Sequence, residues 1–237
     1  MVTPSLSAGG AERSVVLLSE GFLRRQHDVN IVTLSASAAD SFNLPQGVAR
    51  QSLDVAADSR FFVQGLWRNL SRLAAVRKAI RATRPDIVIS HQTETNVLTQ
   101  LALANTGYPV VLVEHSDPAT NTRRRIWRML RRAVYPRAAA LVSVSRSISD
   151  CFKWLPESKK AVIPNPVRTI EAEISAGENR TGRGTKQKWV AAMGRLIPVK
   201  GFDRLLAAFA DLAEKHADWQ LVILGEGKLR TDLEQQI

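Results

Sequence analysis

Two basic residues flank a short glycine-containing loop near the C-terminal end of the chain. Arg195 and Lys200 lie in the segment 194–201, directly after the apolar run 189–193, which is typical of a buried β-strand. At the carboxyl end of a strand, backbone N–H groups and two cations can bind a diphosphate, the arginine in bidentate fashion and the lysine as a point charge. The alternative is that both are ordinary solvated loop residues.

Two further polar features occupy comparable places in the first half of the chain. His115 follows the apolar run 110–113, in the sequence Glu-His-Ser-Asp, where it can contact a ligand or form only a hydrogen bond within the loop. Gly9 and Gly10 precede a predicted helix, and paired glycines let a backbone approach phosphates closely or simply form a turn. These residues are the candidates for chemistry.

The elements around these residues predict an α/β fold. Apolar runs at 29–34, 86–90, 110–113 and 140–144 are typical of buried strands, and apolar residues recur at helical spacing in 11–25, 62–81 and 94–105. Continuous apolar strands separated by helices favour a parallel sheet covered on both faces. Ligands of such sheets bind at the carboxyl ends of the strands.

A change in composition indicates two domains. Residues 1–167 form the predicted first Rossmann-like domain, and the polar, glycine-containing stretch 168–188 is predicted to be a linker or long loop. The segment 189–237 then begins a second unit with strand, loop, helix, strand and part of another helix. One such unit is less than a domain, so we expect an incomplete second domain.

Several segments together resemble the family-four retaining glycosyltransferases of the GT-B fold. The resemblance rests on Gly-Arg-Leu at 194–196, Lys-Gly-Phe-Asp at 200–203, Pro-Ser-Leu-Ser-Ala-Gly-Gly-Ala-Glu-Arg at 4–13 and Ile-Pro-Asn-Pro-Val at 163–167. It implies that the donor diphosphate binds Gly9, Gly10, Arg195 and Lys200. It also implies a catalytic contact for His115, as polar and electrostatic support of the transition state rather than as a general base.

The resemblance also implies a reaction. A hexose or N-acetylhexosamine would pass with retention from a UDP- or GDP-sugar to a saccharide or lipid-linked acceptor, in the synthesis of surface polysaccharide, lipopolysaccharide or glycolipid. The implied enzyme is cytoplasmic or peripheral on the inner face of the cytoplasmic membrane. Neither a cofactor nor a metal ion is expected, because Arg195 and Lys200 would offset the diphosphate charge.

The chain departs from the family pattern in two places. The first strand is short, since only residues 1–3 precede the family's first loop. The family's E-x7-E motif lies beyond Gly225-Glu-Gly227, and Glu226 with Glu234 has that spacing in the wrong element. We therefore expect negligible sugar transfer by the 237-residue chain alone.

Two smaller segments have alternative interpretations. Ser145 and Asn165 match family positions, but a helix N-cap and a turn residue, respectively, are the preferred interpretations. The segment 123–137 holds seven arginines and no acidic residue, with Ile126, Leu130 and Ala133 or Val134 as a narrow apolar stripe. Arg123, Arg124, Arg125 and Arg128 are predicted to face an acceptor or an anionic membrane, or else to form a solvated basic helix face.

Composition limits the remaining possibilities. The net charge of +11 favours anionic partners, and a single cysteine, Cys151, excludes an intrachain disulfide and a C-x-x-C metal site. A basic nucleic-acid-binding module lacks a recognised motif here, so no nucleic acid is expected. A dinucleotide-dependent oxidoreductase would need G-x-G-x-x-G after a strand, which the sequence does not contain.

Overall fold

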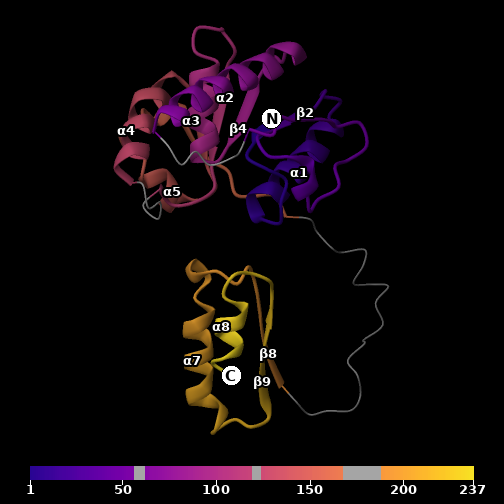
Figure 1. The fold of residues 1–237 in the computed structure, drawn as a ribbon, viewed down its shortest axis with the longest axis vertical. Helices are drawn as coiled ribbons and strands as arrows, with labels where there is room; N and C mark the ends of the chain where they lie inside the picture. The colour runs from indigo at the N-terminus through magenta and orange to yellow at the C-terminus, as the bar shows by residue number, and fades with distance from the viewer. Residues whose placement is uncertain (56–61, 119–123, 168–187) are drawn as a thin grey trace. The chain divides into compact units, whose positions relative to one another are not determined.

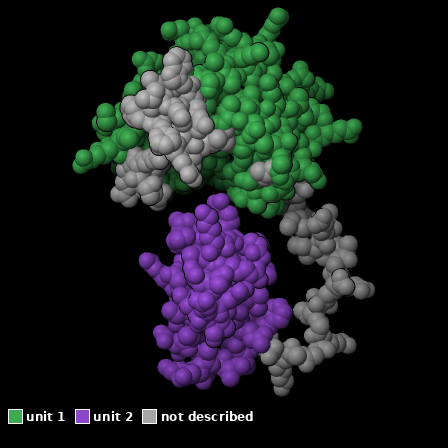
Figure 2. Space-filling model, in the orientation of Figure 1, with its two compact units in different colours: residues 1–169 green, residues 170–237 purple. Residues whose placement is uncertain are grey.

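A computed structural model describes residues 1–55, 62–118, 124–167 and 188–237 of the chain. The chain divides into two compact units, Met1–Thr169 and Ile170–Ile237, which are coloured separately in Figure 2. The predicted linker 168–188 lies outside the described residues except for Lys188. No helix in the described ranges is long and apolar enough to cross a bilayer.

Unit 1 is built on a seven-stranded sheet in which every pair of neighbouring strands is parallel. The strand order is β3-β2-β1-β4-β5-β6-β7, so the direction in which strands are added reverses between β1 and β4. The strands are β1 (Val2–Thr3), β2 (Asn30–Thr33), β3 (Ala49–Ser52), β4 (Val88–His91), β5 (Val110–Glu114), β6 (Ala140–Ser143) and β7 (Lys160–Val162).

Helices cover both faces of this sheet (Figure 1). They are α1 (Gly10–Leu23), α2 (Phe62–Thr83), α3 (Thr93–Ala102), α4 (Arg124–Val134) and α5 (Arg146–Asp150). Successive residues of β2 show the two faces, because Ile31 packs in the α1 cluster and Val32 in the larger cluster of α2, α3 and α4. The core is thus divided by the sheet, as the parallel pattern requires.

Unit 2 contains one strand-helix-strand repeat and a short final helix. Its strands β8 (Lys188–Met193) and β9 (Trp219–Leu224) are parallel and are joined by α7 (Phe202–Ala213), after which α8 (Arg230–Glu234) follows. Leu196, Phe202 and Leu233 form its small core. The predicted strand and helix of this segment are therefore present.

The sequence pattern identified the apolar elements and missed the polar ones. The predicted strands at 29–34, 86–90, 110–113 and 140–144 correspond to β2, β4, β5 and β6. Strand β3 was missed because Ala-Arg-Gln-Ser has no apolar run and lies at the edge of the sheet, mostly exposed. The short edge strand β7 was missed for the same reason.

Candidate functional site

The predicted polar residues of unit 1 gather at the carboxyl ends of the strands. Gly9 caps α1 beyond β1, while His115 directly follows β5. Strand β1 pairs with both β2 and β4, so this edge includes the point where the strand order reverses. In open parallel sheets that point is where ligands bind.

The start of α1 is linked to the end of β4 by a side-chain contact. Glu12, in the first turn of α1, accepts a hydrogen bond from Gln92 Nε2 at 3.0 Å. A Cβ on Gly9 would lie 2.2 Å from a Glu12 carboxylate oxygen, whereas one on Gly10 would meet nothing within 4 Å. Glycine at position 9 therefore leaves room for this carboxylate, and Gly10 leaves its backbone open.

His115 forms a pair with a second histidine that the sequence analysis did not single out. His91, the last residue of β4, is fully buried, and its Nδ1 lies 3.0 Å from His115 Nε2. The two rings are stacked, with centroids 5.3 Å apart. Burial, followed by the nearby charge of His115, lowers the pKa of His91 to about 3.

The surroundings of the His115 ring include a residue of the segment after β7. Nδ1 is buried without a hydrogen bond of normal geometry, and the side chain of Asn165 is close enough to affect the ring. Burial lowers the pKa of His115, and Asn165 and the charge of Glu12 oppose that shift. Asn165, for which a turn was the preferred interpretation of the sequence, therefore lies close to His115.

The last residue of β5, Glu114, carries a buried carboxyl group. Glu114 accepts hydrogen bonds from the hydroxyls of Tyr135 and Thr93, the latter at 2.8 Å, and from Asn96 Nδ2 at 3.3 Å. Burial raises the pKa of Glu114, while these donors and the charge of Arg131 act against the shift. The residue that precedes His115 is thereby fixed by α3, by α4 and by Tyr135.

In unit 2, close backbone packing shapes the loop after β8. A Cβ on Gly225 would lie 1.9 Å from the carbonyl oxygen of Gly194, and one on Gly227 would lie 2.3 Å from that of Leu196. The amide of Leu196 donates to the carbonyl of Glu226 at 2.9 Å. Because backbone atoms cannot yield as a side chain can, glycine is required at both positions.

Arg195 and Lys200 lie on this fixed loop, and both are exposed. Neither forms an ion pair within the part of the chain that the structure describes. Gly201 has a φ of +66° and begins α7, whose first N–H groups are at the same strand end. The structure therefore places the two predicted cations beside an open helix N-terminus, an arrangement suited to a phosphate group.

The two glutamates with the E-x7-E spacing have a different environment. Arg230 donates to Glu226 and, at 2.9 Å, to Glu234, so both carboxylates form ion pairs with one guanidinium. This is a surface ion-pair cluster on α8. It agrees with the interpretation that these residues do not form the family motif.

The basic helix α4 differs in detail from the predicted stripe. Leu130 and Val134 pack against the core, whereas Ile126 is 61% exposed and Met129 is 70% exposed. Arg125, Arg128 and Arg132 are exposed on the same helix, and Arg131 is buried with its guanidinium 5.9 Å from the Phe152 ring. The prediction that Leu130 and Val134 belong to the outward stripe was therefore wrong. Arg123 and the side chain of Arg124 lie outside the described residues.

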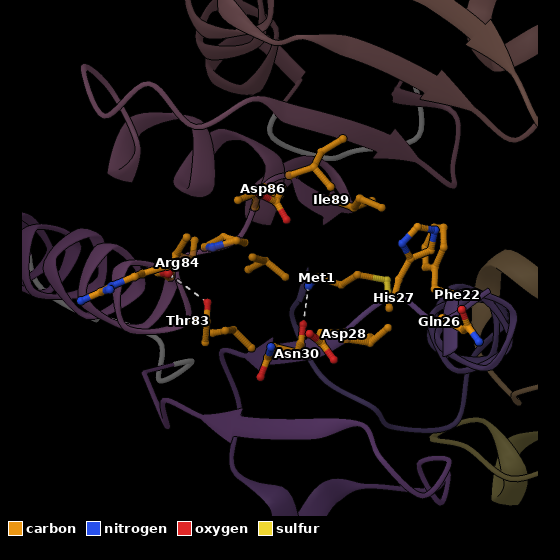
Figure 3. A pocket seen from close by; sticks show the side chains of 17 residues that line it. Met1, Phe22, Gln26, His27, Asp28, Asn30, Thr83, Arg84, Asp86 and Ile89 are labelled. Carbon is orange, nitrogen blue, oxygen red and sulfur yellow. Dashed lines mark hydrogen bonds between the residues drawn. The ribbon is translucent and has the colours of Figure 1, made fainter. Parts of the chain in front are cut away.

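A separate cavity lies at the opposite ends of the strands. It has a volume of about 610 Å3 and is lined by residues before β2 and before β4, together with Met1 (Figure 3). Among these are Asp28, Asn30, Arg84 and Asp86. These are the amino ends of the strands, so this cavity is separate from the polar residues at the carboxyl ends.

Three positions of the candidate site were missed by sequence reasoning, namely Glu12, His91 and Gln92. His91 and Gln92 end a strand just as Glu114 and His115 do, so the rule that selected His115 also applies to them. Glu12 had been noted only as part of the segment 4–13. Ser145, in contrast, is confirmed as a helix cap, because its Oγ accepts from the Ile148 amide at 3.3 Å.

Comparison with known proteins identifies a family and several relatives. Residues 8–171 match the family Glycosyltransferase Family 4, and residues 175–237 match Glycosyl transferases group 1. An α-1,4-N-acetyl-D-galactosaminyltransferase of Campylobacter jejuni is 29% identical over 100% of this chain and 63% of its own length. A phosphatidyl-myo-inositol mannosyltransferase of Propionibacterium freudenreichii is 25% identical over 94% of this chain and 60% of its own length.

Solved structures show the same fold at low sequence identity. Anabaena HepE in complex with UDP and glucose superimposes with a TM-score of 0.68 at 18% identity, over 100% of this chain and 65% of its own. A UDP-GlcNAc 2-epimerase of Methanocaldococcus jannaschii has a TM-score of 0.62 at 12% identity, over 99% of this chain and 67% of that one. The fold alone therefore does not select the reaction.

The chain spans 63% of the length of the Campylobacter jejuni relative and 65% of that of HepE. The first family match covers more than half of the chain, including Gly9, Gly10, His91 and His115. The predicted family and the predicted GT-B-like α/β fold class are confirmed. By this match and by its fold, the chain belongs to glycosyltransferase family 4.

Proposed function

We propose that the chain provides the acceptor-side domain and the diphosphate loop of a retaining sugar transferase. The donor is a UDP- or GDP-linked hexose or N-acetylhexosamine. The acceptor is a saccharide or a lipid-linked saccharide used in the synthesis of surface polysaccharide or glycolipid at the inner face of the cytoplasmic membrane. Support for the donor comes from HepE, which was solved with UDP and glucose. Support for the acceptor comes from the Campylobacter jejuni relative, whose name includes a diNAcBac-PP-undecaprenol saccharide.

The observation that carries this proposal is a pair of exposed cations at the start of α7, Arg195 and Lys200, neither of which has an ion pair among the described residues. A diphosphate leaving group carries negative charge that grows as the sugar bond breaks. A fixed guanidinium, a lysine and helix N–H groups stabilise that charge more in the transition state than in the ground state. We propose that these groups take this role without a metal ion or cofactor.

Calorimetric titration tests the diphosphate site. UDP, GDP and their sugars would be titrated into the wild-type chain and into Arg195→Ala with Lys200→Ala at two salt concentrations. We expect diphosphate-dependent binding that falls at least about 10-fold in the double variant, because two charge-assisted contacts are lost. The preferred base also identifies the donor.

A matched control separates a specific site from general electrostatics. Lys188→Ala with Lys215→Ala removes the same charge from the amino-end side of β8 and β9. We expect it to retain wild-type affinity at physiological salt. Equal losses in both double variants, or no binding of any nucleotide by the folded wild-type chain, would contradict the proposed diphosphate site.

We further propose that His115 contacts the donor sugar or the acceptor through a nitrogen-bound proton. Its half-buried ring follows β5, its Nε2 is paired with His91, and Asn165 and Glu12 lie close enough to affect the ring. A neutral ring held in this way donates a hydrogen bond to a sugar hydroxyl or to a developing negative charge. This role agrees with polar support of the transition state and does not require proton abstraction.

The exposed face of α4 is the proposed membrane contact. Ile126 and Met129 project outward among Arg125, Arg128 and Arg132, an arrangement that inserts apolar groups at a lipid interface while cations meet anionic headgroups. Arg123 and Arg124 extend the same basic sequence. Contact of this kind would bring the acceptor-side domain to a lipid-linked acceptor.

Vesicle sedimentation at low salt tests the α4 contact. We expect wild-type protein to bind vesicles containing phosphatidylglycerol and not vesicles of phosphatidylcholine alone. Ile126→Ser with Met129→Ser keeps every charge and is expected to weaken binding, as is Arg125→Glu with Arg128→Glu. Arg24→Glu with Arg25→Glu, at the end of α1, is the matched charge control and should weaken binding less. Equal binding to both kinds of vesicle would contradict the proposal.

A further inference from the structure

His91 is a fully buried histidine whose only side-chain hydrogen bond among the described residues is to another histidine. Its Nδ1 lies 3.0 Å from His115 Nε2, and its own Nε2 is buried with no hydrogen-bond partner. The buried amide of Asn96 and the hydroxyl of Thr93, on the helix that follows, are instead directed to Glu114. His91 is therefore available to act on His115 alone.

The backbone around His91 is fixed by more than the strand. His91 pairs with Val113, two residues before His115, and the Gln92 amide donates to the Val113 carbonyl at 3.0 Å. Gln92 has a φ of +71°, a conformation that costs energy for a residue with a side chain. Its side chain then donates to Glu12. This turn ends β4 with the His91 ring held against His115.

One hydrogen bond between two neutral imidazoles allows two proton arrangements. In the first, His91 Nδ1–H donates to His115 Nε2, so the buried Nε2 of His91 is a bare acceptor and His115 carries its proton on Nδ1. In the second, His115 Nε2–H donates, and His91 must hold an N–H in a fully buried place without an acceptor. Each arrangement leaves one N–H over, on Nδ1 of His115 in the first and on Nε2 of His91 in the second. His115 is half-buried and lies close to Asn165, whereas His91 is fully buried, so the remaining N–H costs less on His115.

We propose that His91 is a positioning residue that holds the proton of His115 on Nδ1. The inference rests on the proposed contact of His115 with the sugar or acceptor. In this arrangement Nδ1 of His115 is a hydrogen-bond donor, which agrees with the effect of the nearby Asn165 in raising the pKa of His115. His91 thus selects hydrogen-bond donation and leaves His115 Nε2 unable to serve as a free base.

Nitrogen-detected tautomer measurement by NMR tests this directly. The chain contains only four histidines, and exposed His27 and His216 serve as internal references in a long-range proton–nitrogen spectrum of 15N-labelled protein. At pH 7.5 we expect pyrrole-type Nδ1 and pyridine-type Nε2 signals for both His91 and His115. A pyrrole-type Nε2 on His115 in the wild-type chain overturns the inference.

Variants at position 91 test causation. His91→Leu removes the hydrogen-bonding group and should shift His115 toward the Nε2–H form that free histidine side chains prefer. His91→Asn restores an N–H near the position of Nδ1 and should return His115 to the Nδ1–H form. An unchanged His115 tautomer in folded His91→Leu overturns the proposal. If that variant fails to fold, the wild-type tautomer and the His91→Asn spectrum decide the question.

The spectrum does not depend on sugar transfer, so the two proposals fail separately. A wild-type Nδ1–H tautomer lost in His91→Leu, with no effect of His115→Ala on nucleotide binding or transfer, would support the positioning role and contradict the proposed role of His115. In an active protein, His91→Leu should lower kcat with little change in the donor KM, and His91→Asn should recover most of kcat.

Discussion

The two candidate ligand-binding regions of this chain are built in opposite ways. At the carboxyl ends of β4 and β5, the polar groups are buried and already bonded to each other, as His91 is to His115 and Glu114 is to Tyr135. In the loop after β8, Arg195 and Lys200 are exposed, without ion pairs in the described chain, and are placed only by backbone packing.

This difference separates residues that stabilise the fold from residues that remain available to bind a ligand. Buried polar groups contribute to folding because a lost partner leaves another group unsatisfied in a medium of low dielectric constant. Exposed cations contribute little to folding and remain available for an anion. Substitutions in unit 1 should therefore change the free energy of unfolding, and substitutions of the unit 2 cations should change affinity.

The largest expected effect is at Glu114. Glu114→Ala removes the acceptor of Tyr135, Thr93 and Asn96 and leaves buried Arg131 without its neighbouring carboxyl group, for an expected loss of about 3–5 kcal/mol. Amide hydrogen exchange at β5 and α3 measures the loss within unit 1. Glu114→Gln retains an acceptor and should lose less. A loss below about 1 kcal/mol for the alanine variant would contradict the claim that the buried polar groups of unit 1 stabilise its fold.

A backbone clash in unit 2 should have the next largest effect. Gly227→Ala places a methyl group where the Leu196 carbonyl stands, with an expected cost of about 1–3 kcal/mol. Hydrogen exchange at β8 and β9 should report it. Gly10→Ala, which meets open space, is the control and should change stability by less than about 0.5 kcal/mol. Similar effects of the two changes would show that the loop repacks freely.

The free energy of unfolding of unit 1 should depend on pH because His91 stays neutral in the folded chain. Its pKa falls from 6.5 to about 3 on folding, so between these values the unfolded chain takes up a proton that the folded chain does not. Stability should therefore fall as pH decreases below 6.5, by up to about 1.4 kcal/mol per pH unit for this group.

The difference between wild type and His91→Leu isolates this dependence. His115, the Met1 amino group and Glu12 lie near the pair, and Glu114, whose raised pKa acts in the opposite sense, lies on the adjoining strand end. Melting temperatures from pH 7.5 to 5 should fall more steeply in wild type than in the variant. Parallel curves would show that His91 is charged in the folded protein.

The smallest expected effect on stability is at Arg195 and Lys200. Arg195→Ala with Lys200→Ala should change the free energy of unfolding of unit 2 by no more than about 0.5 kcal/mol, because neither side chain has an ion pair among the described residues. Hydrogen exchange without nucleotide provides the measurement. A loss above about 1 kcal/mol would mean that these side chains stabilise the loop itself.

Sequence reasoning recovered those features that follow from local pattern. The apolar runs of β2, β4, β5 and β6 predicted their strands, and the position of His115 after one of them predicted its place at the carboxyl edge. The Gly-Arg-Leu and Lys-Gly-Phe-Asp segments predicted the family that the comparison confirmed.

The features that the sequence did not predict depend on contacts between distant parts of the chain. His91 and His115 are 24 residues apart, and Glu12 and Gln92 are 80 apart, so no local spacing indicates either pair. The prediction of an outward apolar stripe on α4 was wrong at Leu130 and Val134. Arginines all around a helix do not reveal which side of it faces the core. Strand β3 formed through its edge position although its sequence is polar.

The ion pairs of Arg230 have a consequence for the electric field around the diphosphate loop. Glu226 belongs to the turn that is hydrogen-bonded to Leu196, next to Arg195, but its carboxylate forms no ion pair with Arg195 among the described residues. Arg230 instead binds Glu226 together with Glu234. The positive charge of Arg195 is therefore exposed to solvent and can attract an anion before the two come into contact.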